Sequence, residues 1–197
     1  MHPFIYLASQ SPRRSQLLTQ LGIAHELLLA TQEEDAESLE VHLPGETPLA
    51  YEQRVTRLKL EAAQNRLQAR ALPGAPVLCA DTTVALGNTI YAKPADAEDA
   101  VRMLTALAGQ THVVLTAVAI GVGNQCVQAC SVSEVTFAPM SEAEIRAYVA
   151  SGEPMGKAGA YAVQGRAAAY ISRINGSYTG IMGLPLYETA QLLKSLA

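Results

Sequence analysis

Two adjacent arginines stand where a helix is expected to begin, which is an unusual place for positive charge. Residues 4–8, FIYLA, have the pattern of a buried strand, and Ser11-Pro12 then match an N-cap followed by a proline at the first helical position. Arg13 and Arg14 come next, although a helix N-terminus repels cations and attracts anions, phosphates in particular. The pair therefore predicts a phosphate site; the alternative is that both arginines face solvent.

Acidic side chains in two places could hold a divalent metal ion or activate a water molecule. Asp81 follows the apolar residues VLCA, and we expect it to end a buried strand, where α/β proteins bind ligands. Glu33, Glu34 and Asp35 follow another apolar stretch, HELLLA, and could supply the oxygen ligands that Mg²⁺ or Mn²⁺ prefers. The alternatives are a turn aspartate at position 81 and a solvated acidic loop.

A lysine and two glycine-rich loops could complete a nucleotide site. Lys93, next to Pro94, could neutralise phosphate charge, although an exposed lysine after a hairpin would look the same. The loops GEPMGKAGAYAVQG (152–165) and NGSYTGIMGLP (175–185) let the backbone approach a ligand closely, and ordinary turns are the alternative. The amide of Gln164 offers a donor and an acceptor together, which suits the edge of a base.

The segments that must position these residues alternate between strand and helix patterns, and a hairpin makes at least one strand pair antiparallel. This alternation predicts an α/β fold with a mixed sheet. Strands are predicted over 4–8, 25–30, 77–81, in a hairpin around Gly87-Asn88, twice within 112–137, and over 167–174. Helices are predicted from Ser11 to Gly22, from Thr47 to about Arg70, over 95–108, from the capping box Ser141-x-x-Glu144, and from Pro185.

Composition excludes several classes of protein. The 197 residues are 49% hydrophobic and carry a net charge of −4, which favours a globular protein and argues against a nucleic-acid binder. No apolar stretch reaches the roughly 18 residues that a membrane span needs, and the start lacks a charged segment typical of an export signal. Three cysteines, an odd number, then predict reduced thiols and a cytoplasmic protein.

Taken in order along essentially the whole chain, these motifs resemble the Maf family of nucleoside triphosphate pyrophosphatases. The stretches that carry the resemblance are LASQSPRR, the acidic loop, ADTTV with AKP, GQTHVVLTAV, GEPMGKAGAYAVQG and INGSYTGIMGLPLYET. The two last loops resemble the branch of the family that acts on dTTP and UTP. The branch that acts on 7-methyl-GTP has a different loop in place of AGAYAVQG.

The resemblance implies an activity, a fold and an assembly. Family members hydrolyse a nucleoside triphosphate between the α and β phosphates, need a divalent cation (Mg²⁺, Mn²⁺ or Co²⁺), and many are cytoplasmic homodimers. The fold implied is like that of inosine triphosphatases, with a mixed, curved sheet, surrounding helices and a central cleft. Residues 1–197 would form a single Maf-like domain, and two lobes around the cleft are an alternative description of it. Because the family has been linked to septum formation, a non-catalytic nucleotide-binding regulator stays an alternative, as does an enzyme for modified nucleotides.

The resemblance also assigns roles to residues. Asp81 falls on the proposed proton acceptor, and Asp81 with Glu34 on positions implied in metal binding, although Glu33 is an alternative to Glu34. The positions implied in substrate binding or choice are Ser9, Arg13, Arg14, Thr82, Lys93 and Gln164. Relatives usually carry a lysine in the long helix, where Ala62 stands here with Lys59 about one turn earlier. Whether Lys59 replaces that lysine stays open at this stage.

Overall fold

The computed structural model describes residues 4–31, 34 and 37–196, and their strands form one mixed sheet. The strands are β1 Ile5–Leu7, β2 His25–Leu27, β3 Val77–Leu86, β4 Thr89–Tyr91, β5 Thr111–Val122, β6 Gln125–Phe137 and β7 Ile171–Asn175. The α-helices are α1 Pro12–Gln20, α2 Pro48–Ala69, α3 Ala97–Leu107, α4 Glu142–Val149, α5 Tyr178–Ile181 and α6 Leu186–Ser195. Three short 3₁₀ helices are η1 Glu37–Glu40, η2 Ala158–Ala160 and η3 Arg166–Tyr170.

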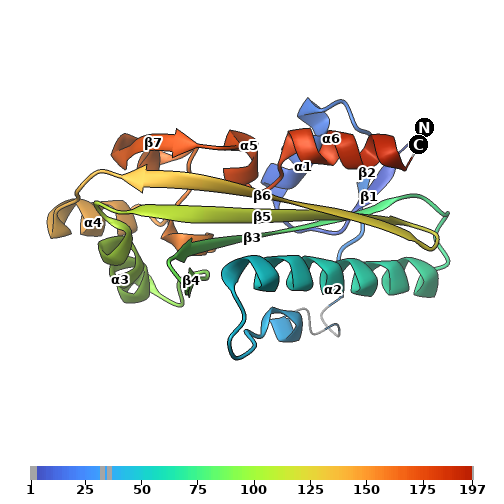
Figure 1. The fold of residues 1–197 in the computed structure, drawn as a ribbon, viewed down its shortest axis with the longest axis horizontal. Helices are drawn as coiled ribbons and strands as arrows, with labels where there is room; N and C mark the ends of the chain where they lie inside the picture. The colour runs from blue at the N-terminus through green and yellow to red at the C-terminus, as the bar shows by residue number, and fades with distance from the viewer. Residues whose placement is uncertain (1–3, 32–33, 35–36, 197) are drawn as a thin grey trace.

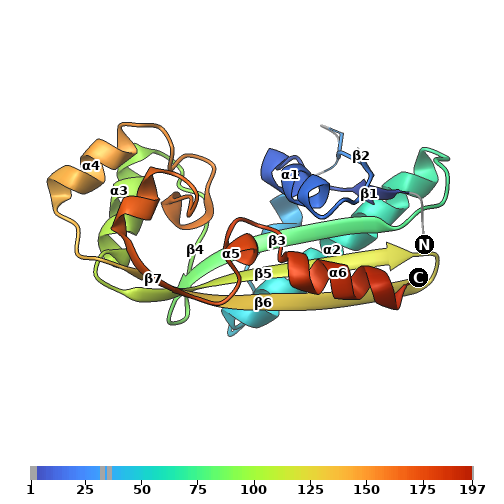
Figure 2. The same ribbon diagram turned by 90° about the horizontal axis from the view of Figure 1, so that it is seen from above.

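Three long strands form the frame of the molecule. The strand order is β2-β1-β3-β5-β6-β7, and β4 pairs with β3 in addition. β1 runs parallel to β2 and β3, whereas the other pairs are antiparallel. Along the frame, α3 and α4 gather at one end and α1, β1, β2 and α6 at the other (Figures 1 and 2). The mixed sheet with surrounding helices, predicted from the sequence, is confirmed.

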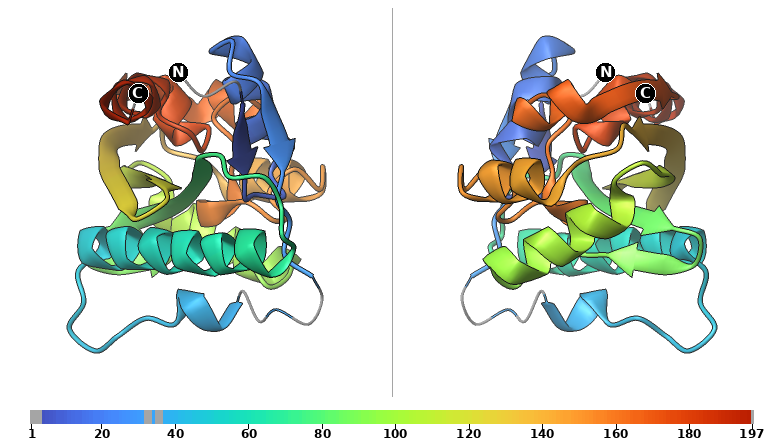
Figure 3. Two further views of the ribbon diagram at one scale, coloured as in Figure 1. Left: turned by 90° about the vertical axis from the view of Figure 1, so that its right-hand side faces the viewer. Right: turned by 90° about the vertical axis from the view of Figure 1, so that its left-hand side faces the viewer.

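The alternation of side chains along β3 and β5 divides the core between the two faces of the sheet. Leu78 and Val118 belong to the cluster that packs against α1 and α6. Cys79 and Ala119 point the other way, into the cluster with Leu60 of α2. Figure 3 shows α2 on one side of the sheet and α1 and α6 on the other. The odd-numbered residues in the middle of β3 therefore face α2, and the even-numbered ones face α1 and α6.

One edge of β3 is unpaired in the middle of the strand. On that side β3 pairs with β1 at Val77 and Leu78 and with β4 at 84–86, so no strand of the described residues covers 79–83. On its other side β3 pairs with β5 from Val77 to Ala85. The prediction that the strand ends at Asp81 is therefore wrong, because continuous pairing with β5 and the β-branched residues 82–84 extend it to Leu86. Asp81 instead lies just beyond the end of the β1–β3 pairing.

The predicted helix starts are confirmed in position, and some of the expected capping hydrogen bonds are formed. Thr47 caps α2 by accepting a bond from the N–H of Ala50 at 3.3 Å, and Ser141 and Glu144 form the expected capping box. Ser11 occupies the N-cap of α1, with proline next, but its side chain makes no capping bond. Its own N–H donates to Ser9 Oγ at 3.2 Å, which holds the loop before the helix.

The C-terminal third differs most from the sequence prediction. The strand expected over 167–174 begins only at Ile171, because pairing with β6 starts there and the preceding residues form η3. The two glycine-rich loops contain short helices, η2 in loop 152–165 and α5 in loop 175–185. The strand expected over 25–30 is limited to β2. No described helix is both long and apolar enough to cross a membrane.

Candidate active site

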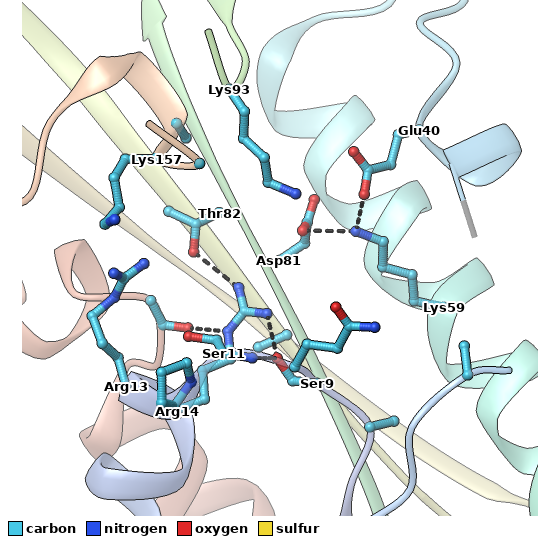
Figure 4. A pocket seen from close by; sticks show the side chains of 18 of the residues that line it. Ser9, Ser11, Arg13, Arg14, Glu40, Lys59, Asp81, Thr82, Lys93 and Lys157 are labelled. Carbon is cyan, nitrogen blue, oxygen red and sulfur yellow. Dashed lines mark hydrogen bonds and ion pairs between the residues drawn. The ribbon is translucent and has the colours of Figure 1, made fainter. Parts of the chain in front are cut away.

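A cavity of about 1240 Å³ lies at the unpaired edge of β3. Its walls come from the loop after β1 and from α1, α2, β3 and the two glycine-rich loops (Figure 4). The structure brings all the predicted site residues to this one cavity: Ser9, Arg13, Arg14, Glu34, Asp81, Thr82, Lys93 and Gln164. The sequence separation between Ser9 and Gln164 shows that the fold, and not a local motif, assembles them.

Arg14 is held by three different segments of the chain. Its Nε donates to the carbonyl oxygen of Gly183 at 2.8 Å, and its Nη1 donates to Ser9 Oγ at 3.1 Å. Its Nη2 donates to Thr82 Oγ1 at 3.3 Å. The guanidinium thus joins the loop after β1, the middle of β3 and the second glycine-rich loop. Most of its donors are used inside the protein, so Arg14 organises the wall of the cavity.

Arg13 is in the opposite situation, because it has no hydrogen-bond or ion-pair partner among the described residues. It is partly buried and points into the cavity (Figure 4). Burial lowers the pKa of its guanidinium, and the neighbouring charge of Arg14 lowers that pKa further. Both effects disfavour an unpaired cation, and a bound anion would offset both. Of the two adjacent arginines, Arg13 is therefore the one available to a ligand.

Asp81 is paired with a lysine that reaches it from α2. Lys59 Nζ lies 2.8 Å from Asp81 Oδ1 and 2.6 Å from Glu40 Oε1 (Figure 4). Burial opposes the charge of Lys59, but the two carboxylates outweigh burial and raise the pKa of the ammonium. Lys59 is therefore a cation in the site, and its replacement of the lysine that relatives carry at position 62 stays a prediction. Ala62 lines the same cavity without contributing charge.

Glu34, the predicted second metal ligand, lines the cavity but is bound by an arginine. Arg66 donates to its carboxylate from Nε at 2.9 Å and from Nη2 at 2.5 Å. These hydrogen bonds lower the pKa of Glu34 and keep it ionised. The joint role of Asp81 and Glu34 at a metal stays a prediction. The alternative Glu33 and the adjacent Asp35 lie outside the described residues.

The donor set beside Asp81 suits a divalent cation that arrives with phosphate. Within 4–31, 34 and 37–196, no three His, Cys, Asp or Glu side chains form a metal-binding group. The carboxylates of Asp81 and Glu40 nevertheless converge on a single cation, the Lys59 ammonium. Proteins commonly hold Mg²⁺ with one or two carboxylates and complete its coordination with water and substrate phosphates. The residues present fit such a site.

The other end of the cavity is formed by the first glycine-rich loop, which is packed firmly onto the core. Tyr161 stacks edge-on against Phe137 at 4.9 Å between ring centroids, and its hydroxyl lies 2.8 Å from His112 Nε2. Burial lowers the pKa of His112 to about 4, so its ring is neutral. Gln164 follows on the same loop, exposed at the cavity wall with apolar neighbours such as Val163. The part of the wall formed by Tyr161, Ala162 and Val163 is apolar and suits an uncharged, flat group.

Sequence reasoning missed several charged residues of the cavity. Glu40 lies in η1, within the acidic loop, which has no helical pattern in the sequence. Arg66 lies near the C-terminal end of α2, where the polar sequence suggested exposure to solvent. Lys157 stands inside the motif GEPMGKAGAYAVQG, which was interpreted only for its glycines and Gln164. Figure 4 shows Lys157 on the same side as Arg13, and Lys93 pointing toward Asp81. Lysines inside a glycine-rich loop are the signal that could have identified Lys157.

A cavity that combines several cations and paired carboxylates with an apolar wall and an amide defines a class of protein. It is built to hold a small molecule with a polyphosphate tail and an uncharged head. The comparisons with known proteins agree with that class. The model of the Maf-like protein family matches residues 4–196, and the chain belongs to this family.

The relatives are similar over nearly their whole lengths. The chain is 65% identical over 195 residues to a dTTP/UTP pyrophosphatase of Albidiferax ferrireducens, covering 99% of this chain and 98% of the relative. It is 62% identical to a dTTP/UTP pyrophosphatase of Polaromonas sp., covering 98% of this chain and 95% of the relative. Among solved structures, the Ham1 protein of Staphylococcus aureus is similar at 15% identity with a TM-score of 0.42, over 68% of this chain and 71% of that one.

Proposed function

We propose that this protein hydrolyses dTTP and UTP to the nucleoside monophosphate and pyrophosphate, which removes these nucleotides from the cellular pool. The observation that carries the proposal is the Asp81 carboxylate, fixed by Lys59 in a cavity lined by further cations. The names of the relatives, dTTP/UTP pyrophosphatases at 57–65% identity, support the same activity. No observation favours a non-catalytic regulator or an enzyme for modified nucleotides.

The triphosphate would bind with its charges against the cations of the cavity. Arg13 is unpaired among the described residues, so it can bind non-bridging phosphate oxygens through its planar donors. Lys93 and Lys157 line the cavity and add positive charge around the tail. Arg14 would act mainly by keeping Ser9 and Thr82 in place, because its own donors are occupied.

Asp81 would orient the attacking water and accept its proton. Oδ1 is bound to Lys59, and Oδ2 has no partner among the described residues, so one oxygen remains for the water. The water attacks the α phosphorus, the bond from that phosphorus to the bridging oxygen breaks, and pyrophosphate leaves with the electron pair. A bound divalent cation, which Asp81 with Glu34 or Glu40 would hold, neutralises phosphate charge and makes water a stronger acid. Pyrophosphate is a stable leaving group, so no strong general acid is required.

The pyrimidine would lie at the loop that carries Gln164. Uracil and thymine share an acceptor–donor–acceptor edge, and one amide with neighbouring backbone groups can pair with both. The small side chain of Ala162 lines the cavity and would leave room for the methyl group of thymine, whereas Ala160 does not line it. Ala160 and Ala162 are themselves buried, which fixes the loop that presents Gln164.

A triphosphate panel tests the proposal directly. The purified protein is incubated with dTTP, UTP, CTP, GTP and 7-methyl-GTP in Mg²⁺, Mn²⁺ or Co²⁺, and released pyrophosphate is measured. We expect pyrophosphate from dTTP and UTP, and none in the presence of a metal chelator. A preference for GTP or its methylated form would contradict the pyrimidine assignment, and absence of any turnover would favour a non-catalytic nucleotide-binding protein.

The role of Asp81 has its own test in Asp81→Asn. The amide keeps the shape of the side chain but is neutral and cannot take the proton, so turnover should fall by about a hundredfold or more. Circular dichroism and thermal unfolding check that the variant is folded. Normal turnover in a folded Asp81→Asn protein would remove Asp81 from the mechanism.

We also propose that the protein is a cytoplasmic homodimer and that residues 1–197 form one domain. Cys79, Cys126 and Cys130 are free thiols, which is typical of a reducing compartment. The long strands β3, β5 and β6 run through both ends of the molecule, which supports a single folding unit. Light scattering after size-exclusion chromatography measures the assembly state, and cell fractionation measures the location.

A further inference from the structure

A second carboxyl group lies behind the active site and has no part in the mechanism above. Glu52 belongs to α2, and its side chain is fully buried at 0% exposure. Its Oε2 accepts from Thr83 Oγ1 at 2.6 Å, and its Oε1 accepts from the N–H of Ala117 at 3.2 Å. No part of Glu52 lines the cavity, so it cannot contact a ligand there.

Both groups that bind Glu52 are close neighbours of Asp81 in the sheet. Thr83 is two residues after Asp81 on β3, so the two side chains leave the same face of the strand. Ala117 is the residue of β5 directly opposite Asp81 in the β3–β5 register. Glu52 thus binds one side chain and one backbone group that flank Asp81.

Glu52 and the lysine of the active site also share one face of α2. Glu52 and Lys59 are seven residues apart, which is nearly two helical turns and about 10 Å along the helix axis. Thr56 lies between them and is buried, but its hydroxyl has no partner among the described residues. Two polar contacts therefore connect α2 to β3: Glu52 with Thr83, and Lys59 with Asp81.

A buried carboxyl group is a poor choice for stability alone. Removing it from water is costly, and an apolar side chain of similar volume is often as stable or more stable in such a place. Burial and the charge of Asp81 raise the pKa of Glu52 to about 8, against the hydrogen bonds from Thr83 and Ala117. The hydrogen bonds of Glu52 are directional, however. They can fix the position of α2 along its axis relative to β3, which an apolar side chain could not do.

We propose that Glu52 is a positioning residue for the Lys59–Asp81 pair. Its hydrogen bonds to Thr83 and Ala117 fix α2 along its axis at the position from which Lys59 reaches Asp81. The catalytic consequence rests on the proposed pyrophosphatase function, but the positioning itself can be measured without substrate. Loss of the bond lets α2 shift, so Lys59 no longer holds the Asp81 carboxylate in the orientation that the attacking water needs.

The first test uses Thr83→Val, which removes the hydroxyl that binds Glu52 and keeps the shape of the side chain. The chain has four lysines, so the titration of Lys59 can be followed by nitrogen NMR on lysine-labelled protein. The pKa of Lys59 is raised by its two carboxylate partners in the wild type, and in Thr83→Val it should fall. An unchanged Lys59 titration in Thr83→Val overturns the inference, whether or not the protein is an enzyme.

The second test measures turnover, and it separates positioning from stability. We expect Thr83→Val to lower kcat by about tenfold to a hundredfold with little change in KM, as for a small displacement of a reacting group. Thr83→Ser, which keeps the hydroxyl, should retain wild-type kcat and the wild-type Lys59 titration. If wild-type protein turns over no triphosphate, the proposed function fails, while the NMR test still decides the positioning.

A matched control is available in α6. Thr189 is fully buried, and its hydroxyl donates to the carbonyl oxygen of Pro185 at 2.8 Å, so Thr189→Val also loses one buried hydrogen bond. It should lower stability by a similar amount and leave kcat unchanged.

Lys59→Met should lower kcat, and adding Thr83→Val should lower it little further, because both changes break the same support of Asp81. Equal effects of Thr83→Val and Thr189→Val, or additive losses in the double variant, would reduce Glu52 to a purely structural residue.

Discussion

At the scale of single residues, identical side chains next to each other in the sequence have different surroundings and different tasks. Arg14 donates to Gly183, Ser9 and Thr82, whereas Arg13 has no partner among the described residues and points into the cavity. Arg14 therefore contributes to the architecture, and Arg13 is available for a ligand. The two substitutions to alanine should separate these tasks.

Arg13→Ala should weaken binding of the triphosphate and leave the fold intact. The variant loses a charge-assisted contact worth about 1.5–3 kcal/mol, so KM should rise by roughly tenfold to a hundredfold. Because no described residue depends on Arg13, the free energy of unfolding should change little or increase. Steady-state kinetics and urea unfolding measure the two effects.

Arg14→Ala is the matched comparison and should lower the free energy of unfolding by about 2–3 kcal/mol, because it leaves several partly buried acceptors without a donor. Equal stability losses in the two variants, or an unchanged KM in Arg13→Ala, would contradict this division of roles.

The residue types at the site could be predicted from the sequence, but their partners could not. Arg13 stands beside a recognisable helix start, so its location in a cavity followed from local pattern, whereas Asp81 was expected there because β3 was expected to end at it, and β3 continues to Leu86. Lys59 and Glu52 lie in a long polar helix in which no local signal marks the face that packs against β3. Their contacts depend on the angle and height of α2 over the sheet, which are set by packing between distant segments.

At the scale of elements, the first glycine-rich loop reaches the core at a single glycine. Gly159 has φ +66°, and a Cβ there would lie 2.8 Å from Val84 Cγ1 on β3. The following residue, Ala160, also has positive φ at 60°, although it carries a side chain. This close contact with β3 fixes the loop just before Tyr161 and Gln164, which line the cavity where we propose that the base binds.

Gly159→Ala should therefore be strongly destabilising. It combines an unfavourable backbone conformation with a steric clash in the core, for about 2–4 kcal/mol. Gly123→Ala is the control, since Gly123 has φ +56° at a hairpin tip with nothing within 4 Å of an added Cβ. It should cost only the backbone strain, about 1 kcal/mol. Chemical unfolding of both variants measures the difference, and similar losses would show that contact with Val84 is unimportant.

The elements themselves were predictable to different degrees, for a physical reason. The helices with proline or capping signals begin where the sequence predicts, because those signals act within one turn. β3 extends beyond its expected end because pairing with β5 continues, and η3 replaces the start of a strand because no pairing begins before Ile171. Strand ends depend on a neighbour that is distant in the sequence, and local patterns do not contain that information.

At the scale of the whole molecule, two buried titratable groups predict how stability depends on pH. The pKa of Glu52 is raised from 4.5 to about 8, so its neutral form is favoured by folding, and this contribution is lost as pH rises through that range. The pKa of His112 is lowered from 6.5 to about 4, so its contribution is lost as pH falls through that range. The pH range of maximal stability is therefore limited on its alkaline side by Glu52 and on its acidic side by His112.

Glu52→Gln should remove the alkaline part of this dependence. The amide can still accept from the N–H of Ala117 and pair with the Thr83 hydroxyl, but it does not ionise. Urea unfolding at about pH 5, 7 and 9 should show wild-type stability declining toward the alkaline side, relative to the variant. Parallel pH curves for the two proteins would mean that Glu52 is not a buried neutral acid.

If the nucleotide binds as we propose, β3 would also fix where along it the cut is made. Val84 lies against Gly159 of the first glycine-rich loop. Asp81 and Val84 are three residues apart on one continuous strand, so about 10 Å separates them, and movement of the loops does not change this distance. In that arrangement the position of the scissile bond would be set by its distance from the nucleobase, and not from the free end of the phosphate tail. A nucleoside diphosphate held in this way would be opened at the same bond, with orthophosphate in place of pyrophosphate as the departing fragment.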